Sequence, residues 1–85
     1  MNKKDLFSKI AEALEVNDEI TLESSNETIL QWDSLGHISV LSMLDDETNG
    51  ASSEIVDLTQ ATSVKRIIEI LSENDLLIKW KRFLF

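Results

Sequence analysis

The chain has 85 residues, no cysteine, one histidine and a formal net charge of −8, which suits one small domain. Without cysteine it can form no disulfide framework, and a structural zinc site is disfavoured because such sites need several Cys or His ligands. The acidic balance argues against nucleic acid as a partner, since that affinity comes largely from cationic contacts to phosphate. It suits a partner with a basic docking face.

Charge is unevenly distributed along the chain. Residues 1–75 contain all 16 acidic residues, whereas 76–85 contain Lys79, Lys81 and Arg82 and no acid. We therefore predict a helical domain over 1–75, followed by a basic aromatic extension over 76–85. No stretch approaches the roughly 20 apolar residues of a membrane span, and the N-terminus lacks the apolar run of a signal peptide. We expect a cytoplasmic protein, and a monomer.

Composition favours an all-α fold, because Leu, Ile and Val are frequent while glycine and aromatic residues are few. Apolar residues recur at three- and four-residue spacing over 3–15, which predicts an amphipathic helix that Asn2 can cap. Residues 17–33 lack a period and are long for a connection, so they carry function or contain a short turn of helix. Their scattered apolar residues predict a loop pinned across the core. Ile20-Thr21-Leu22 alternates like a strand, but no second strand is available to pair with it.

A second helix is predicted over 34–47, because its apolar residues follow the helical period. Gly50 is the natural left-handed residue to stop it. A short third helix is predicted over 54–58. Its inward-facing residues are expected to be Ile55, Val56 and Leu58.

The last helix is predicted over 63–74, capped by Thr62, with apolar residues at the i, i+3, i+4 and i+7 positions. The extension 76–85 allows two interpretations. It can continue the last helix and pack on the first. Alternatively, it is a small amphipathic segment for a membrane surface or a partner.

Asp33 and Ser34 mark the point where the polar loop ends and the second helix begins. Asp33 is a good N-cap residue, because its carboxylate can accept a hydrogen bond from an unpaired N–H of the first turn. Ser34 then stands at a helix N-terminus, which is a ready anion site. It is either a simple helix-start residue or a residue that carries a phosphate.

Catalysis is not expected, although Asp33, Ser34 and His37 are the residue types of a hydrolytic triad. A triad needs an oriented base, an oxyanion hole and a pocket, and the chain has no Gly-x-Ser-x-Gly elbow. No glycine-rich loop suggests nucleotide binding. His37 is interpreted as a partly exposed residue that flanks Ser34, or as an ordinary helix residue.

The segment Asp33-Ser34-Leu35, followed by Ile38, Leu41 and a closing acidic run, resembles the acyl carrier protein family, including peptidyl carrier domains. The resemblance covers about residues 3–74. The family is an all-α, four-helix bundle with a long first loop and a short third helix. Its motif serine takes a 4′-phosphopantetheine arm from coenzyme A. The resemblance implies a carrier, not an enzyme, that holds acyl or aminoacyl groups as thioesters.

By this resemblance Ser34 is the attachment site of the arm, with Asp33 and Leu35 as its motif neighbours. The implied partners are a phosphopantetheinyl transferase and an acyl or aminoacyl ligase or acyltransferase. The residues expected to dock them are Gly36, His37, Ile38, Met43, Asp45, Asp46 and Glu47.

Two features qualify this interpretation. Gly36 and His37 stand where typical fatty-acid carriers begin an acidic stretch, which suggests a specialised carrier rather than a primary fatty-acid carrier. The three acids Asp45, Asp46 and Glu47 lie near the negative end of the helix dipole, where they are mildly unfavourable. They either serve a partner or form a solvated surface patch. The alternative to a carrier is a helical interaction module of the same fold that is never modified.

Overall fold

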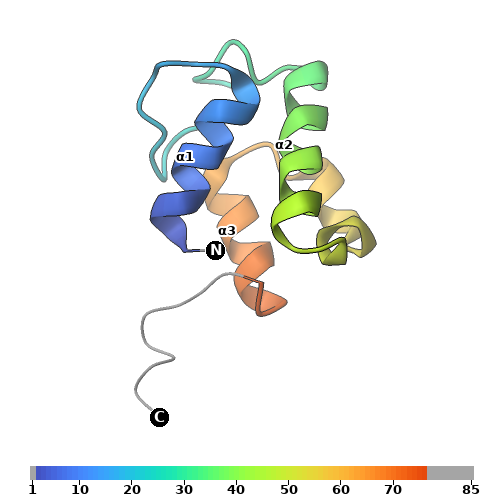
Figure 1. Cartoon of the computed structure of the whole chain (residues 1–85). Helices are drawn as coiled ribbons and strands as arrows, with labels where there is room; N and C mark the ends of the chain where they lie inside the picture. Colours follow the sequence, from blue (N-terminus) through green and yellow to red (C-terminus); the bar gives the residue numbers. More distant parts are fainter. Residues whose placement is uncertain (1, 77–85) are drawn as a thin grey trace.

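The computed structural model describes residues 2–76 (Figure 1). This part of the chain folds into three α-helices and two 3-10 helices, with a long loop between the first two α-helices, so the predicted all-α class is confirmed. The elements in chain order are α1 (Lys3–Leu14), α2 (Ser34–Glu47), η1 (Ala51–Glu54), η2 (Val56–Gln60) and α3 (Val64–Glu73).

The core lies between the three α-helices. In Figure 1, α1 and α2 run antiparallel to each other, and α3 completes the bundle. α3 presents the most continuous apolar face, because apolar side chains follow the helical period along its whole length. The fully buried side chains with the largest volumes are Trp32, Leu6, Ile10, Leu44, Leu58, Ile67, Ile70, Leu71, Val40 and Val64.

Caps define where the helices begin. The side chain of Asn2 accepts a hydrogen bond from the Asp5 N–H at 2.8 Å, as predicted. The last helix begins one residue later than expected. Ser63, not Thr62, is its N-cap, and its hydroxyl accepts from the Arg66 N–H at 3.2 Å. A serine hydroxyl caps as well as a threonine hydroxyl, so composition alone could not separate the two neighbours.

The long loop is pinned across the core, as its scattered apolar residues predicted. Ile20, Ile29 and Trp32 are all buried. Midway along the loop, an isolated antiparallel bridge joins Ser25 to Ser63, at the start of α3. The bridge consists of two backbone hydrogen bonds, from Asn26 N–H to Thr62 O at 2.9 Å and from Val64 N–H to Ser24 O at 3.0 Å. The loop is therefore fixed at its middle as well as at its ends.

The prediction of a single third helix over 54–58 is wrong. Two 3-10 helices occupy this region, separated by Ile55 in an extended conformation with φ −102° and ψ 97°. Segments this short hold few i to i−4 hydrogen bonds, and the tighter 3-10 turn is the usual outcome. Leu58 is buried as expected, but Val56 points outward with 77% of its surface exposed.

Leu76 is the last described residue, and its partly buried side chain packs against the core. The rest of the predicted extension 76–85 lies outside the described residues, together with both interpretations of it. Within residues 2–76, none of the helices combines the length and the apolar character needed to cross a membrane.

Candidate functional site

Ser34 is the first residue of α2, and its side chain is exposed to solvent. Asp33 precedes it in an extended conformation and acts as the N-cap: a carboxylate oxygen accepts a hydrogen bond from the Gly36 N–H at 2.8 Å. The cap fixes the first turn, so Ser34 has a defined position at the positive end of the helix dipole. The predicted helix start at Asp33 and Ser34 is confirmed.

Large apolar side chains close to this serine in α2 are exposed to solvent. Leu35 is 75% exposed and Ile38 is 60% exposed, although both belong to a well-formed helix. They lie three residues apart, which places them on neighbouring positions of one α2 face. Val56 of η2 is another large apolar residue left in solvent. Sequence analysis missed Val56, because its apolar character alone suggested an inward-facing position.

Gly36 lies where the first turn of α2 meets the preceding loop. A Cβ atom at this position would overlap the backbone carbonyl oxygen of Gln31 and approach Leu14 Cδ2 to 3.0 Å. Glycine therefore permits a close approach between helix and loop. The structure gives this residue an internal packing role, while direct contact with a partner stays a prediction.

His37 is buried, with only 8% of its surface exposed. The interpretation of this residue as partly exposed is therefore wrong. Its Nδ1 accepts a hydrogen bond from the Trp32 indole N–H at 3.1 Å, and its Nε2 lies 3.0 Å from the Leu58 carbonyl oxygen. Because a carbonyl can only accept, Nε2 carries the proton and donates. The Trp32 and His37 rings also stack, with centroids 6.3 Å apart. Docking of a partner on His37 stays a prediction.

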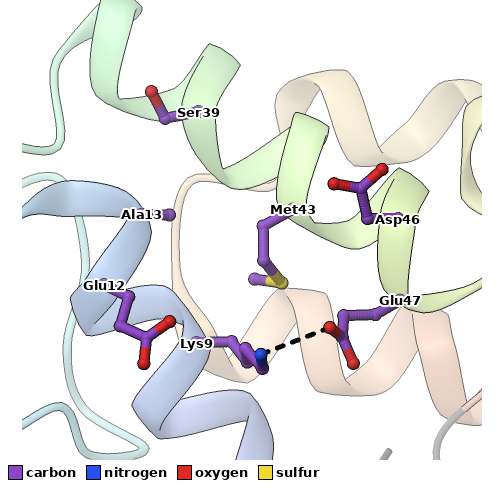
Figure 2. Close-up of a pocket in the computed structure, with 7 residues that line it drawn as sticks. All are labelled: Lys9, Glu12, Ala13, Ser39, Met43, Asp46 and Glu47. Carbon is purple, nitrogen blue, oxygen red and sulfur yellow. Dashed lines mark ion pairs between the residues drawn. The ribbon is translucent and has the colours of Figure 1, made fainter.

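The other predicted docking residues separate onto different sides of α2. Met43 is half-buried and points into a pocket of about 330 Å³ between α1 and α2 (Figure 2). Glu47 lies on the same side and forms an ion pair with Lys9 at 3.5 Å (Figure 2). Asp46 also lines this pocket, whereas Asp45 does not. The full lining is Lys9, Glu12, Ala13, Ser39, Met43, Asp46 and Glu47.

The geometry around Ser34 does not assemble a triad. Both ring nitrogens of His37 are already engaged, one by Trp32 and the other by Leu58. The Asp33 carboxylate caps the helix instead of orienting the imidazole. His37 therefore cannot take a proton from Ser34 without breaking its own buried bonds. Among residues 2–76, no group of three or more His, Asp or Glu side chains could hold a metal ion.

The first turn of α2 thus combines an accessible hydroxyl at a fixed helix start with the exposed apolar side chains of Leu35 and Ile38, and acids occupy the other end of the helix. Comparison with protein-family models, with curated proteins and with solved structures finds no match to this chain.

Proposed function

We propose that this chain is an acyl-carrier-like protein that carries a 4′-phosphopantetheine arm on Ser34. The observation that supports this most directly is an exposed serine, held by a cap as the first residue of α2, with Leu35 and Ile38 uncovered beside it. The long loop before the serine and the short helical segments after α2 agree with the carrier-like bundle that the motif resembles. We also propose that the fold is that of a four-helix carrier bundle.

The chemistry of attachment fits the surroundings of Ser34. The serine oxygen bonds to the phosphorus of the pantetheine phosphate, the pyrophosphate P–O bond of coenzyme A breaks, and adenosine bisphosphate leaves. The serine proton passes to a base of the transferase. The product is a phosphodiester, whose negative charge is favourable at the positive end of a helix dipole. No base from this chain is needed.

The carrier role explains why apolar and acidic residues both remain in solvent on α2. Leu35 and Ile38 offer apolar contact close to the attachment point, and the exposed Asp46 and the half-buried Asp45 offer charge near the other end. Charge steers the approach of a basic partner and speeds exchange between partners. The flexible arm then delivers its thioester at high effective concentration. We infer that a ligase or acyltransferase loads the arm.

Intact-mass measurement tests the proposal. The protein is incubated with coenzyme A and a broad-specificity phosphopantetheinyl transferase. The wild type should gain the mass of one phosphopantetheine arm, and Ser34→Ala should gain none. Ser42→Ala removes another exposed hydroxyl from the same helix and serves as the matched control, because it should be modified like the wild type. A wild type that several transferases leave unmodified would contradict the proposal, as would modification of Ser34→Ala.

The alternative is an unmodified interaction module with the same fold. The exposed Leu35, Ile38 and Val56 favour it equally, because they offer a binding surface whether or not Ser34 is modified. It predicts partner binding that survives Ser34→Ala and that weakens when Asp45 and Asp46 are replaced by asparagine. Thioester loading, measured beside the pull-down, separates the alternatives: a carrier is loaded as the wild type and loses loading with Ser34→Ala, whereas the module is never loaded and keeps its binding.

A further inference from the structure

His37 connects three separate parts of the molecule through its two ring nitrogens. On one side it accepts from Trp32, at the end of the long loop. On the other it donates to the backbone carbonyl of Leu58, in the middle of η2. The ring itself belongs to the first turn of α2. A single buried imidazole thus joins loop, site helix and η2.

The bond to Leu58 matters because η2 has little internal support. It is a 3-10 helix of five residues, and no side chain caps its N-terminus. Such helices have poorer hydrogen-bond geometry than α-helices, so their placement depends on outside contacts. The Leu58 carbonyl accepts from the Ala61 N–H at 3.1 Å within the turn and from His37 at 3.0 Å across to α2. His37 therefore supplies a link from η2 to the site helix.

This link also sets the relative position of exposed apolar residues. Val56 lies two residues before Leu58, and Ile38 follows His37 directly. Both side chains are uncovered, at 77% and 60% exposure. Fixing Leu58 to His37 consequently fixes the exposed apolar residue of η2 relative to that of α2.

We propose that His37 is a positioning residue: by donating to Leu58 it holds η2 against the first turn of α2, so that the exposed Ile38 and Val56 keep a fixed placement relative to each other when the transferase docks. This inference rests on the proposed function, because the transferase is its partner. Leu58 and Ala61 stay buried in the core, so loss of the link leaves η2 packed on α3 but loosens its placement against α2, and only a fraction of molecules present the docking surface. The apparent affinity then falls by that fraction, while the reaction of a docked complex is unchanged.

Two amide substitutions separate the bonds of the imidazole. His37→Asn places an amide oxygen near the position of Nδ1, so it can still accept from Trp32 but does not reach Leu58. His37→Gln extends its amide nitrogen toward the position of Nε2, so it can still donate to Leu58. Ile70→Val removes one methyl group from the buried face of α3 without changing either hydrogen bond of His37, and controls for a general loss of stability.

Steady-state transfer of phosphopantetheine onto the full chain gives the decisive comparison. We expect His37→Asn to raise the KM for the carrier about threefold to tenfold with kcat within twofold of the wild type. His37→Gln should restore most of the KM, and Ile70→Val should leave it unchanged. An unaltered KM in His37→Asn overturns the inference, and so does an equal rise in Ile70→Val.

Amide hydrogen exchange makes this test independent of the proposed function. The Ala61 N–H should exchange at least about fivefold faster in His37→Asn than in the wild type, and His37→Gln should retain its protection. If no transferase modifies the wild type, the proposed function is contradicted. Separately, if the Ala61 N–H exchanges at the same rate in the wild type and all variants, the His37 link is contradicted. If His37→Asn does not fold, loss of Ala61 protection in folded His37→Gln overturns the link, and retained protection supports it.

Discussion

Replacing Gly36 with alanine is expected to destabilise the protein, against the trend of helix propensity. At an open helical position, the change from glycine to alanine stabilises by about 1 kcal/mol. Here the new methyl group would overlap the Gln31 carbonyl oxygen and press on Leu14 Cδ2 at 3.0 Å. The Gln31 oxygen is a backbone atom. Removing the clash with the new methyl group therefore requires the loop itself to move, because no side-chain rotation can do it.

The magnitude follows from these two opposing effects. Overpacking of a well-packed site costs about 1–3 kcal/mol, and the upper half of that range applies when backbone must move. Subtracting the propensity gain leaves a net loss of about 1–2 kcal/mol in the free energy of unfolding. For a domain of this size, that loss lowers the melting temperature by roughly 5–15 °C.

Thermal and urea unfolding followed by circular dichroism measure this effect. Ser42→Ala is the matched control, because Ser42 is an exposed position on the same helix. It should leave stability unchanged or raise it by a few tenths of a kcal/mol. If Gly36→Ala raised the melting temperature as much as Ser42→Ala or more, the close approach between Gly36 and Gln31 would be refuted.

Substitutions at three further positions test the cap, a surface ion pair and the core. Asp33→Ala should lower the free energy of unfolding by about 1 kcal/mol while Asp33→Asn preserves it, since asparagine caps equally well; equal losses in urea melts would exclude the cap. Lys9→Ala should change stability by less than about 0.5 kcal/mol, because both it and Glu47 are partly exposed, and a larger loss would show a stronger pair. Leu44→Ala should cost about 2–5 kcal/mol in the same assay, because Leu44 is fully buried, and a small loss would contradict the packing of α2.

The α-helices could be predicted because their patterns are local. In α3 the apolar residues repeat with the helical period over the whole element, and in α2 the Asp33 cap marks the first residue directly. The bounds of α2 agree with the prediction, whereas α1 ends one residue earlier than expected. Glu15 ends α1 by adopting a left-handed conformation with φ 57°. This could not be predicted from the sequence, because glutamate rarely adopts that conformation.

The internal links of the site could not be predicted, because they depend on contacts across the chain. His37 donates a hydrogen bond to the backbone carbonyl of Leu58. Every residue has a backbone carbonyl, so the sequence does not indicate which one a side chain will bind. The nearness of Trp32 and His37 in sequence was a usable signal, but their pairing depends on how the loop enters α2. For Gly36, sequence analysis counted only the lost helix propensity, whereas the reason for glycine is the Gln31 backbone.

The bridge between Ser25 and Ser63 has a consequence for the order of folding. It ties together two distant points of the chain, and α2, η1 and η2 lie in the closed loop between them. Closing such a long loop costs conformational entropy, and this cost arises before the hydrogen bonds of the bridge can stabilise the fold. We therefore expect the helix that presents Ser34 to form before the bridge does. The middle of the long loop would then join the structure as one of its last parts.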